Sequence, residues 1–214
     1  MILDSNAPSL RTVRTGRPRQ SEIQQRQEVI LEAAGETFLR LGFDGATMDA
    51  VADAARVSKR TLYARYPDKA TLFNAVLRGL INRWLVPIDQ VRSKRGKLEE
   101  RLHSLAHYLA TFALTPQSIS INRIIVSEAE RWPEFGELAN EAGREPAIRA
   151  IVSILQQHQA ELTAIDLEMA AEQFMSLAID SCIRRASLGM TPTSTDIEKW
   201  VTAAVRLFLN GIRK

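Results

Sequence analysis

Hydrophobic residues recur along this chain at the three- and four-residue spacing of amphipathic helices, and no stretch alternates in the way of a β-strand. The first helical pattern begins at Ser21 and stops at Gly42, which we expect to take the left-handed position after a helix end. Prolines, glycines and capping residues divide the rest, and the pattern predicts an all-α protein. The expected helices cover 21–41, 48–55, 59–66, 68–84, 98–112, 116–132, 133–142, 145–155, 166–188 and 194–212.

The stretch from Thr47 to Lys69 predicts two short helices joined by a tight turn. Thr47 supplies a hydroxyl N-cap to the first helix, and Ser58 supplies one to the second. Pro67 should end the second helix at Tyr66, because the residue before a proline is pushed out of the α region. This arrangement is a helix-turn-helix, whose second helix lies in the major groove of DNA.

The second helix has the composition of a DNA reader, with Leu62 and Tyr63 expected to anchor it. Its hydroxyl and cationic side chains can donate hydrogen bonds to base edges and phosphates. The alternative to DNA recognition is an ordinary charged helix that faces solvent. The candidates are Thr61, Arg60 and Arg65 at or near base edges, Tyr63, Lys69, Thr47 and Ser58 at phosphates, and Lys59 as a further donor.

Residues 1–20 are polar and carry no periodicity, which indicates a flexible basic arm. Arg17 and Arg19 are candidates for the minor groove, as in homeodomain arms. The alternative is a solvated tail that adds only general attraction to DNA.

Composition narrows the class of protein. The 214 residues are 45% hydrophobic and 25% charged, with a net charge of +3. A single cysteine, Cys182, excludes an internal disulfide and suits a reducing compartment. No apolar run is long enough for a membrane helix, and the N-terminus has no signal-peptide core, so we expect a cytoplasmic protein without a membrane partner. No catalytic motif is present, so we expect no enzymatic activity and no cofactor.

Residues Val29 to Ala75 resemble the DNA-binding domain of the TetR (tetracycline repressor-like) family of transcriptional regulators. The motifs are G-[FY]-x-x-x-T at 42–47, V-S-x-x-[TS]-[LI]-Y at 57–63 and P-x-K at 67–69. The run from 121 to 155 resembles the C-terminal domain of its AefR-like subgroup. The resemblance implies obligate dimers, operator binding and release by a small ligand. The chain departs from the family pattern at Arg60, where many members have Gly.

These observations divide the chain into an arm at 1–20, a helix-turn-helix domain at 21–67 and a helical ligand-binding and dimerisation domain at 68–214. The helix after Asp68 links the last two, and Pro87 should kink it or end it near Trp84. We expect a repressor that binds a palindromic double-stranded operator as a homodimer and is released by a small-molecule effector. The alternatives are a ligand-binding protein whose head meets another protein, and an enzyme.

The second domain offers candidates for the effector and dimer sites, and in each case plain core packing is the alternative. The last two predicted helices should pair with their copies in a four-helix bundle. His103 and His107 share a helix face, but the sequence does not identify a third metal ligand, so we expect no metal site. The ligand candidates are Trp84, Tyr108, Phe112, Ile125, Glu128, Trp132 and Phe174. The dimer candidates are Phe174, Leu177, Ala178, Ser181, Ile197, Trp200, Val201, Ala204, Val205 and Phe208.

Overall fold

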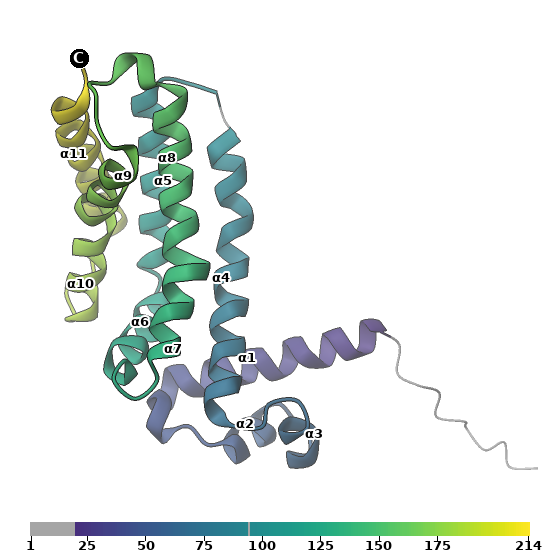
Figure 1. Ribbon diagram of the computed structural model, residues 1–214. Helices are drawn as coiled ribbons and strands as arrows, with labels where there is room; N and C mark the ends of the chain where they lie inside the picture. Colours follow the sequence, from purple (N-terminus) through teal and green to yellow (C-terminus); the bar gives the residue numbers. More distant parts are fainter. Residues whose placement is uncertain (1–19, 94) are drawn as a thin grey trace, which may run out of the picture.

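The computed structural model describes residues 20–93 and 95–214, and its regular structure there is helical apart from one isolated bridge between Leu162 and Arg213 (Figure 1). The all-α prediction is confirmed. Arg17 and Arg19 lie outside the described residues. The helices are α1 Gln20–Gly45, α2 Met48–Ala54, α3 Lys59–Tyr63, α4 Lys69–Ser93, α5 Leu98–Ala113, α6 Pro116–Glu128, α7 Pro133–Ala139, α8 Glu145–Gln157, α9 Leu167–Met175, α10 Ser181–Ser187 and α11 Ser194–Ile212.

Helices α1 to α3 form a unit that we call the head, at the lower end of the molecule in Figure 1, and α4 runs from it into the helical body. Phe38, Val51 and Leu62 are fully buried at the centre of the head. Tyr63, expected to anchor α3, is instead 47% exposed, whereas Tyr66 is 5% exposed and fills the core. Since α3 is short, its apolar side is formed by Leu62 and the turn that follows.

The break in α1 falls at Gly42, as the sequence predicts, but its conformation differs from the one expected. Gly42 has φ 70° and ψ 179°, so the positive φ is present while ψ is extended. This region is open almost only to glycine. The chain therefore turns at Gly42 and adds one more helical turn before α2.

Two helix ends differ from their sequence predictions. Helix α3 ends at Tyr63, and the N–H groups of Arg65 and Tyr66 both bond to the carbonyl of Leu62 in a closing turn. Helix α4 continues past Pro87 to Ser93, so the expectation of an end near Trp84 is wrong. Ile88, just after this proline, is buried in the body, and such packing outweighs the loss of one backbone donor.

The body is a bundle in which α11 packs on α5, while α8 packs on α4, α5 and α9. Two of its helical runs contain π-helical segments, at Asn140–Arg144 between α7 and α8 and at Ser176–Asp180 between α9 and α10. The expected break before Pro146 is therefore a π segment within a continuous helical run. No helix in the described part of the chain is long and apolar enough to cross a membrane.

Candidate nucleic-acid interface and ligand cavity

Both predicted caps of the helix-turn-helix are present. Thr47 Oγ1 accepts from the N–H of Ala50 at 3.1 Å, and Ser58 Oγ accepts from the N–H of Thr61 at 3.1 Å. The hydroxyl oxygens of Ser58 and Thr61 lie 2.7 Å apart at the exposed start of α3. These bonds satisfy helix N-terminal donors and fix where α2 and α3 begin.

The charged side chains of α3 and of the turn after it are exposed but differ in their partners. Lys59 Nζ lies 2.6 Å from Asp49 Oδ2 on α2, and this hydrogen bond raises the pKa of Lys59. Arg65 donates to the side-chain oxygen of Gln27 on α1. Arg60 is exposed and makes none of the hydrogen bonds or ion pairs found among the described residues.

Sequence reasoning missed two further cations beside α3. Arg26 of α1 and Arg56 of the turn are exposed and line a groove between these two elements, which also includes Ser58 and Thr61. Arg56 has φ 53°, a left-handed conformation uncommon outside glycine. Its position in the turn, directly before Val57 and Ser58, is the signal that marks it as a neighbour of the recognition helix.

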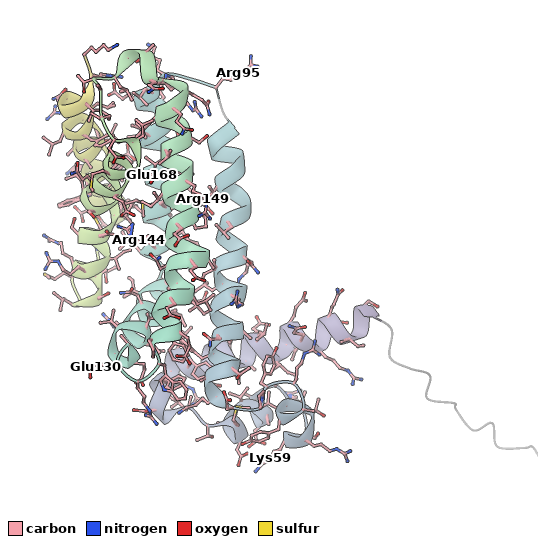
Figure 2. The ribbon with its side chains drawn as sticks, in the orientation of Figure 1. Lys59, Arg95, Glu130, Arg144, Arg149 and Glu168 are labelled. Atoms are coloured by element: carbon pink, nitrogen blue, oxygen red, sulfur yellow. The ribbon has the colours of Figure 1, made fainter. Side chains whose placement is uncertain are left out.

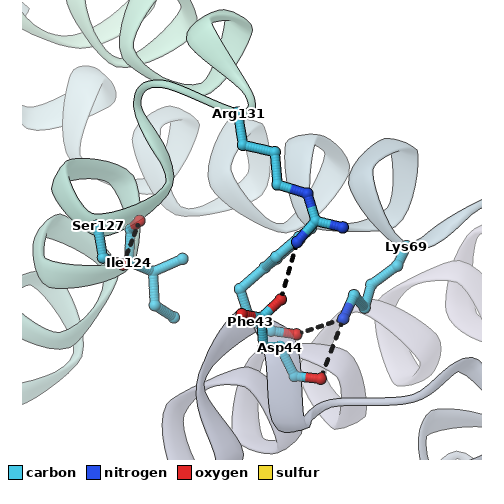
Figure 3. Close-up of polar contacts among 6 residues, drawn as sticks. All are labelled: Phe43, Asp44, Lys69, Ile124, Ser127 and Arg131. Carbon is cyan, nitrogen blue, oxygen red and sulfur yellow. Dashed lines mark hydrogen bonds and ion pairs between the residues drawn. The ribbon is translucent and has the colours of Figure 1, made fainter.

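Lys69, predicted to meet a phosphate, ties α4 to the end of α1 (Figure 3). Its Nζ donates to the carbonyl oxygens of Phe43 at 2.6 Å and Asp44 at 3.3 Å. Arg131, from the connection between α6 and α7, reaches Asp44 Oδ1 at 3.3 Å. Two segments of the body, α4 and the connection between α6 and α7, thus contact the end of α1.

Aromatic rings fill the same junction between head and body. Trp132 packs edge-on to Phe43, with ring centres 6.0 Å apart, and stacks on Phe135 at 5.9 Å. Phe135 also contacts Phe73 of α4 at 4.6 Å. Trp132, a ligand candidate by sequence, therefore lies in this junction.

A cavity of about 380 Å³ lies in the body between α4, α5, α6 and the two runs that contain π segments. Phe112 and Ile125, two of the ligand candidates, line it. Tyr108, Glu128 and Phe174 lie outside its lining, and the side chain of Trp84 lies outside the described part of the structure. The other large apolar side chains of its wall are Leu77, Leu80, Ile81, Leu109, Ile121, Met175, Ile179 and Ile183.

The cavity wall also carries an ion pair that the sequence did not suggest. Arg144 Nη2 lies 2.8 Å from Glu172 Oε2 and 3.2 Å from Asp180 Oδ2. Ser176 Oγ donates to the same Asp180 oxygen at 3.1 Å. Arg144 and Asp180 both line the cavity, and they come from the two π segments, whose irregular period no sequence pattern indicated.

Most of the dimer candidates lie in the core of one protomer, the alternative that their spacing left open. Phe174 and Phe208, for example, pack with ring centres 4.8 Å apart. Leu177 and Ser181 are half-buried, and Trp200 is 37% exposed and donates through Nε1 to the carbonyl of Leu177. The buried members are Phe174, Ala178, Ile197, Val201, Ala204, Val205 and Phe208.

Another side of α11 exposes apolar side chains, with Met190 of the preceding loop beside them. Met190, Trp200 and Ala203 border one groove, and Leu207, seven residues after Trp200, is 63% exposed. Arg185, Asp196 and Lys199 line the same groove. Residues seven apart lie on one side of a helix. We call these four apolar residues the α11 outer face.

The two histidines of α5 contact a carboxylate, and the cysteine is free and buried. His103 and His107 lie 3.2 Å and 3.0 Å from the two carboxylate oxygens of Glu198 on α11. No group of three potential ligands that could hold a metal ion occurs among the described residues. Cys182 is buried, and burial raises the pKa of its thiol, an effect that nearby Arg185 opposes.

Two family profiles match this chain. Residues 30–76 match the tetR family of bacterial regulatory proteins, and residues 100–211 match the C-terminal domain of AefR-like transcriptional repressors. Among curated relatives, the HTH-type transcriptional regulator RutR of Escherichia coli K12 is 36% identical over 80 residues. That alignment covers 37% of this chain and 38% of RutR, so the chain matches well under half the length of this relative.

Solved structures match over nearly the whole chain. A TetR-family regulator from Mesorhizobium loti MAFF303099 superposes with a TM-score of 0.82 over 92% of this chain and 100% of its own, at 24% identity. The flavonoid-responsive regulator FrrA superposes with a TM-score of 0.70 and 30% identity, covering 89% of this chain and 98% of FrrA. Because the AefR-like profile alone spans more than half of the chain, this protein belongs to the TetR family of helix-turn-helix transcriptional regulators.

Proposed function

We propose that this protein is a repressor that binds a palindromic DNA operator as a homodimer and leaves it when a small molecule binds the body. One observation carries the proposal: α3 stands capped and exposed on a head that is joined to a cavity-lining helix. No catalytic activity is part of this proposal.

In the proposed complex α3 lies in the major groove, with Arg60, Thr61 and Arg65 at or near base edges. Ser58 and Tyr63 are placed to reach phosphates on either side, and Lys59 and Thr47 extend the same exposed surface. One such helix contacts few base pairs, so a second copy is needed about one helical turn, roughly 34 Å, away. The arm with Arg17 and Arg19 remains a candidate for the minor groove.

We propose that the second copy packs against the α11 outer face. The four side chains of this face are apolar and exposed, whereas most of the predicted stripe is already covered within the protomer. Exposed apolar surface of this kind marks contacts with other proteins. For one duplex to contact both heads, the two-fold axis of this pair must leave the two heads on the same side of the dimer.

The effector is proposed to occupy the cavity in the body, and the similarity to the flavonoid-responsive regulator FrrA supports a small-molecule effector. Helix α4 connects the sites, because Leu77 and Leu80 line the cavity and Lys69 holds the head. Release requires that the effector bind more tightly to the arrangement of heads that misfits the operator.

An electrophoretic mobility shift with DNA from upstream of the protein's own gene tests the proposal. A retarded band should form at low salt and weaken with a log–log slope of about −0.9 per phosphate neutralised. Absence of a band at low salt would overturn DNA binding and favour a head that meets another protein.

A further inference from the structure

The two π-helical segments of the body meet at the polar end of the cavity. Arg144 is the last residue of Asn140–Arg144, Asp180 is the last residue of Ser176–Asp180, and their side chains form the 3.2 Å ion pair. Arg144 projects from the start of α8 toward α9 and α10, while Arg149 lies farther along α8 (Figure 2). Because π segments inside helices recur at functional sites, this meeting point is a candidate subsite.

Charge at this subsite disfavours an anionic ligand. Among the described residues that line the cavity, Arg144 is the single cation and Asp180 the single acid, and Glu172 adds a second carboxylate to the same guanidinium. The cluster therefore carries an excess of one negative charge. A ligand carboxylate placed here would lose water and find no unpaired cation, which is costly in an apolar cavity.

The subsite also has hydrogen-bonding capacity that the fold leaves unused. Arg144 Nη1 is buried and has no hydrogen-bond partner in the described structure. The bonds to Asp180 from Arg144 and Ser176 both go to Oδ2. An unpaired buried donor is costly, so a ligand oxygen that reaches it gains affinity once the guanidinium turns toward the cavity.

We infer that this cavity binds a neutral, mostly apolar aromatic molecule whose hydroxyl group inserts at the Arg144–Asp180 pair. A hydroxyl donates one hydrogen bond and accepts others, so it donates to the Asp180 carboxylate and accepts from the Arg144 guanidinium. Phe112 and Met175 offer aromatic and sulfur contacts to a ring, and Gly136 and Gly143 leave room for a flat one. This inference rests on the proposed function only in treating the molecule as the effector.

Three compounds of one shape test the class of ligand: trans-4-hydroxystilbene, trans-4-methylstilbene and trans-stilbene-4-carboxylate. Their affinities for the full chain are measured by isothermal titration at neutral pH. The hydroxyl compound should bind about tenfold more tightly than the methyl compound, because it gains hydrogen bonds to charged groups. The carboxylate should bind most weakly of the three.

Two variants with matched controls test the residues. Arg144→Met and Asp180→Asn should each reduce the preference for hydroxyl over methyl to less than threefold, and Asp180→Asn should also improve binding of the carboxylate. Arg149→Met and Glu168→Gln remove the same charges from exposed positions of α8 and α9 and should leave the preference unchanged. Thermal melting shows whether each variant is folded.

A third variant tests the cavity independently of the charges. A Cβ added at Gly136 meets no atom within 4 Å, so Gly136→Leu can project into the cavity and should weaken the hydroxyl and methyl compounds alike. Equal affinities of these two compounds for the wild type, tightest binding of the carboxylate, or binding of none of the three would overturn the inference.

The mobility shift separates this inference from the proposed function. If the hydroxyl compound binds through Arg144 but the operator complex persists, the ligand class stands and effector release fails. If another compound releases the operator equally from the wild type and from Arg144→Met, while the hydroxyl compound does not bind, release stands and this inference fails.

Discussion

The ammonium nitrogen of Lys69 lies 2.6 Å from the carbonyl oxygen of Phe43 and 4.5 Å from the centre of its ring. Lys69 is the first residue of α4, and Phe43 belongs to the last turn of α1. The helix that lines the cavity is therefore fastened to the head at its first residue. A shift of α4 has a direct mechanical route to α1 and to the helices packed on it.

We expect Lys69→Met to lower the stability of the fold more than it lowers the affinity for operator DNA. Two carbonyl groups at the end of α1 lose a charged donor, and the free energy of unfolding should fall by about 1 kcal/mol at this half-buried site. Urea denaturation measures the change, with Arg78→Met, an exposed cation on α4, as the control. A salt dependence of operator binding that drops by about 0.9 in slope would instead assign Lys69 to a phosphate.

Arg60 and Tyr63 should affect operator binding in different ways. Arg60 is exposed on α3 and has no partner among the described residues, so Arg60→Ala should cost about 1–3 kcal/mol at one base pair and relax the preference there. Tyr63→Ala should weaken every operator variant to a similar extent. Fluorescence anisotropy against single base-pair variants distinguishes the two, and a uniform loss from Arg60→Ala would place that residue on a phosphate.

Features set by neighbours in sequence could be predicted well. The caps at Thr47 and Ser58 each depend on a hydroxyl that accepts a hydrogen bond from the N–H three residues later, and both bonds are present. The family motifs extend this local information to the whole head. The position of α3 and its exposed donors could thus be predicted before the structure.

Features set by packing between distant segments could not be predicted in the same way. Apolar spacing identified the stripe that contains Phe174 and Phe208, but spacing does not say whether a protomer or its copy covers that stripe. Trp132 likewise looked like a ligand contact until Phe43, some ninety positions earlier, proved to be its neighbour. The Arg144–Asp180 pair depends on two π-helical segments, and no pattern of hydrophobic residues in the sequence indicates where such segments form.

Leu207→Glu should dissociate the proposed dimer without unfolding the protomer. Leu207 is 63% exposed, so a carboxylate there costs little in one chain but would be buried between two. Sedimentation should show the mass falling from twice 24.0 kDa toward 24.0 kDa. Val126→Glu, at a residue 68% exposed on α6, is the control and should remain dimeric. A dimer that survives Leu207→Glu would move the interface elsewhere.

Asp68 should stabilise the start of α4 in a pH-dependent way. Its Oδ1 accepts from the N–H of Thr71 at 2.7 Å, and this bond lowers the pKa of the carboxyl from its ordinary 3.8. The folded state therefore binds this proton less readily than the unfolded state, so the stabilisation is present above pH 3.8 and is lost as the pH falls through the lower, folded value.

We expect Asp68→Ala to reduce the free energy of unfolding by about 1 kcal/mol at pH 7. The difference between this variant and the wild type should shrink as denaturation is repeated at pH values below 3.8. Asp68→Asn keeps a side-chain acceptor without a charge, so its difference from the wild type should be small at pH 7. If Asp68→Ala costs the same at every pH, Asp68 stabilises the start of α4 as a hydrogen-bond acceptor only, and its charge does not contribute.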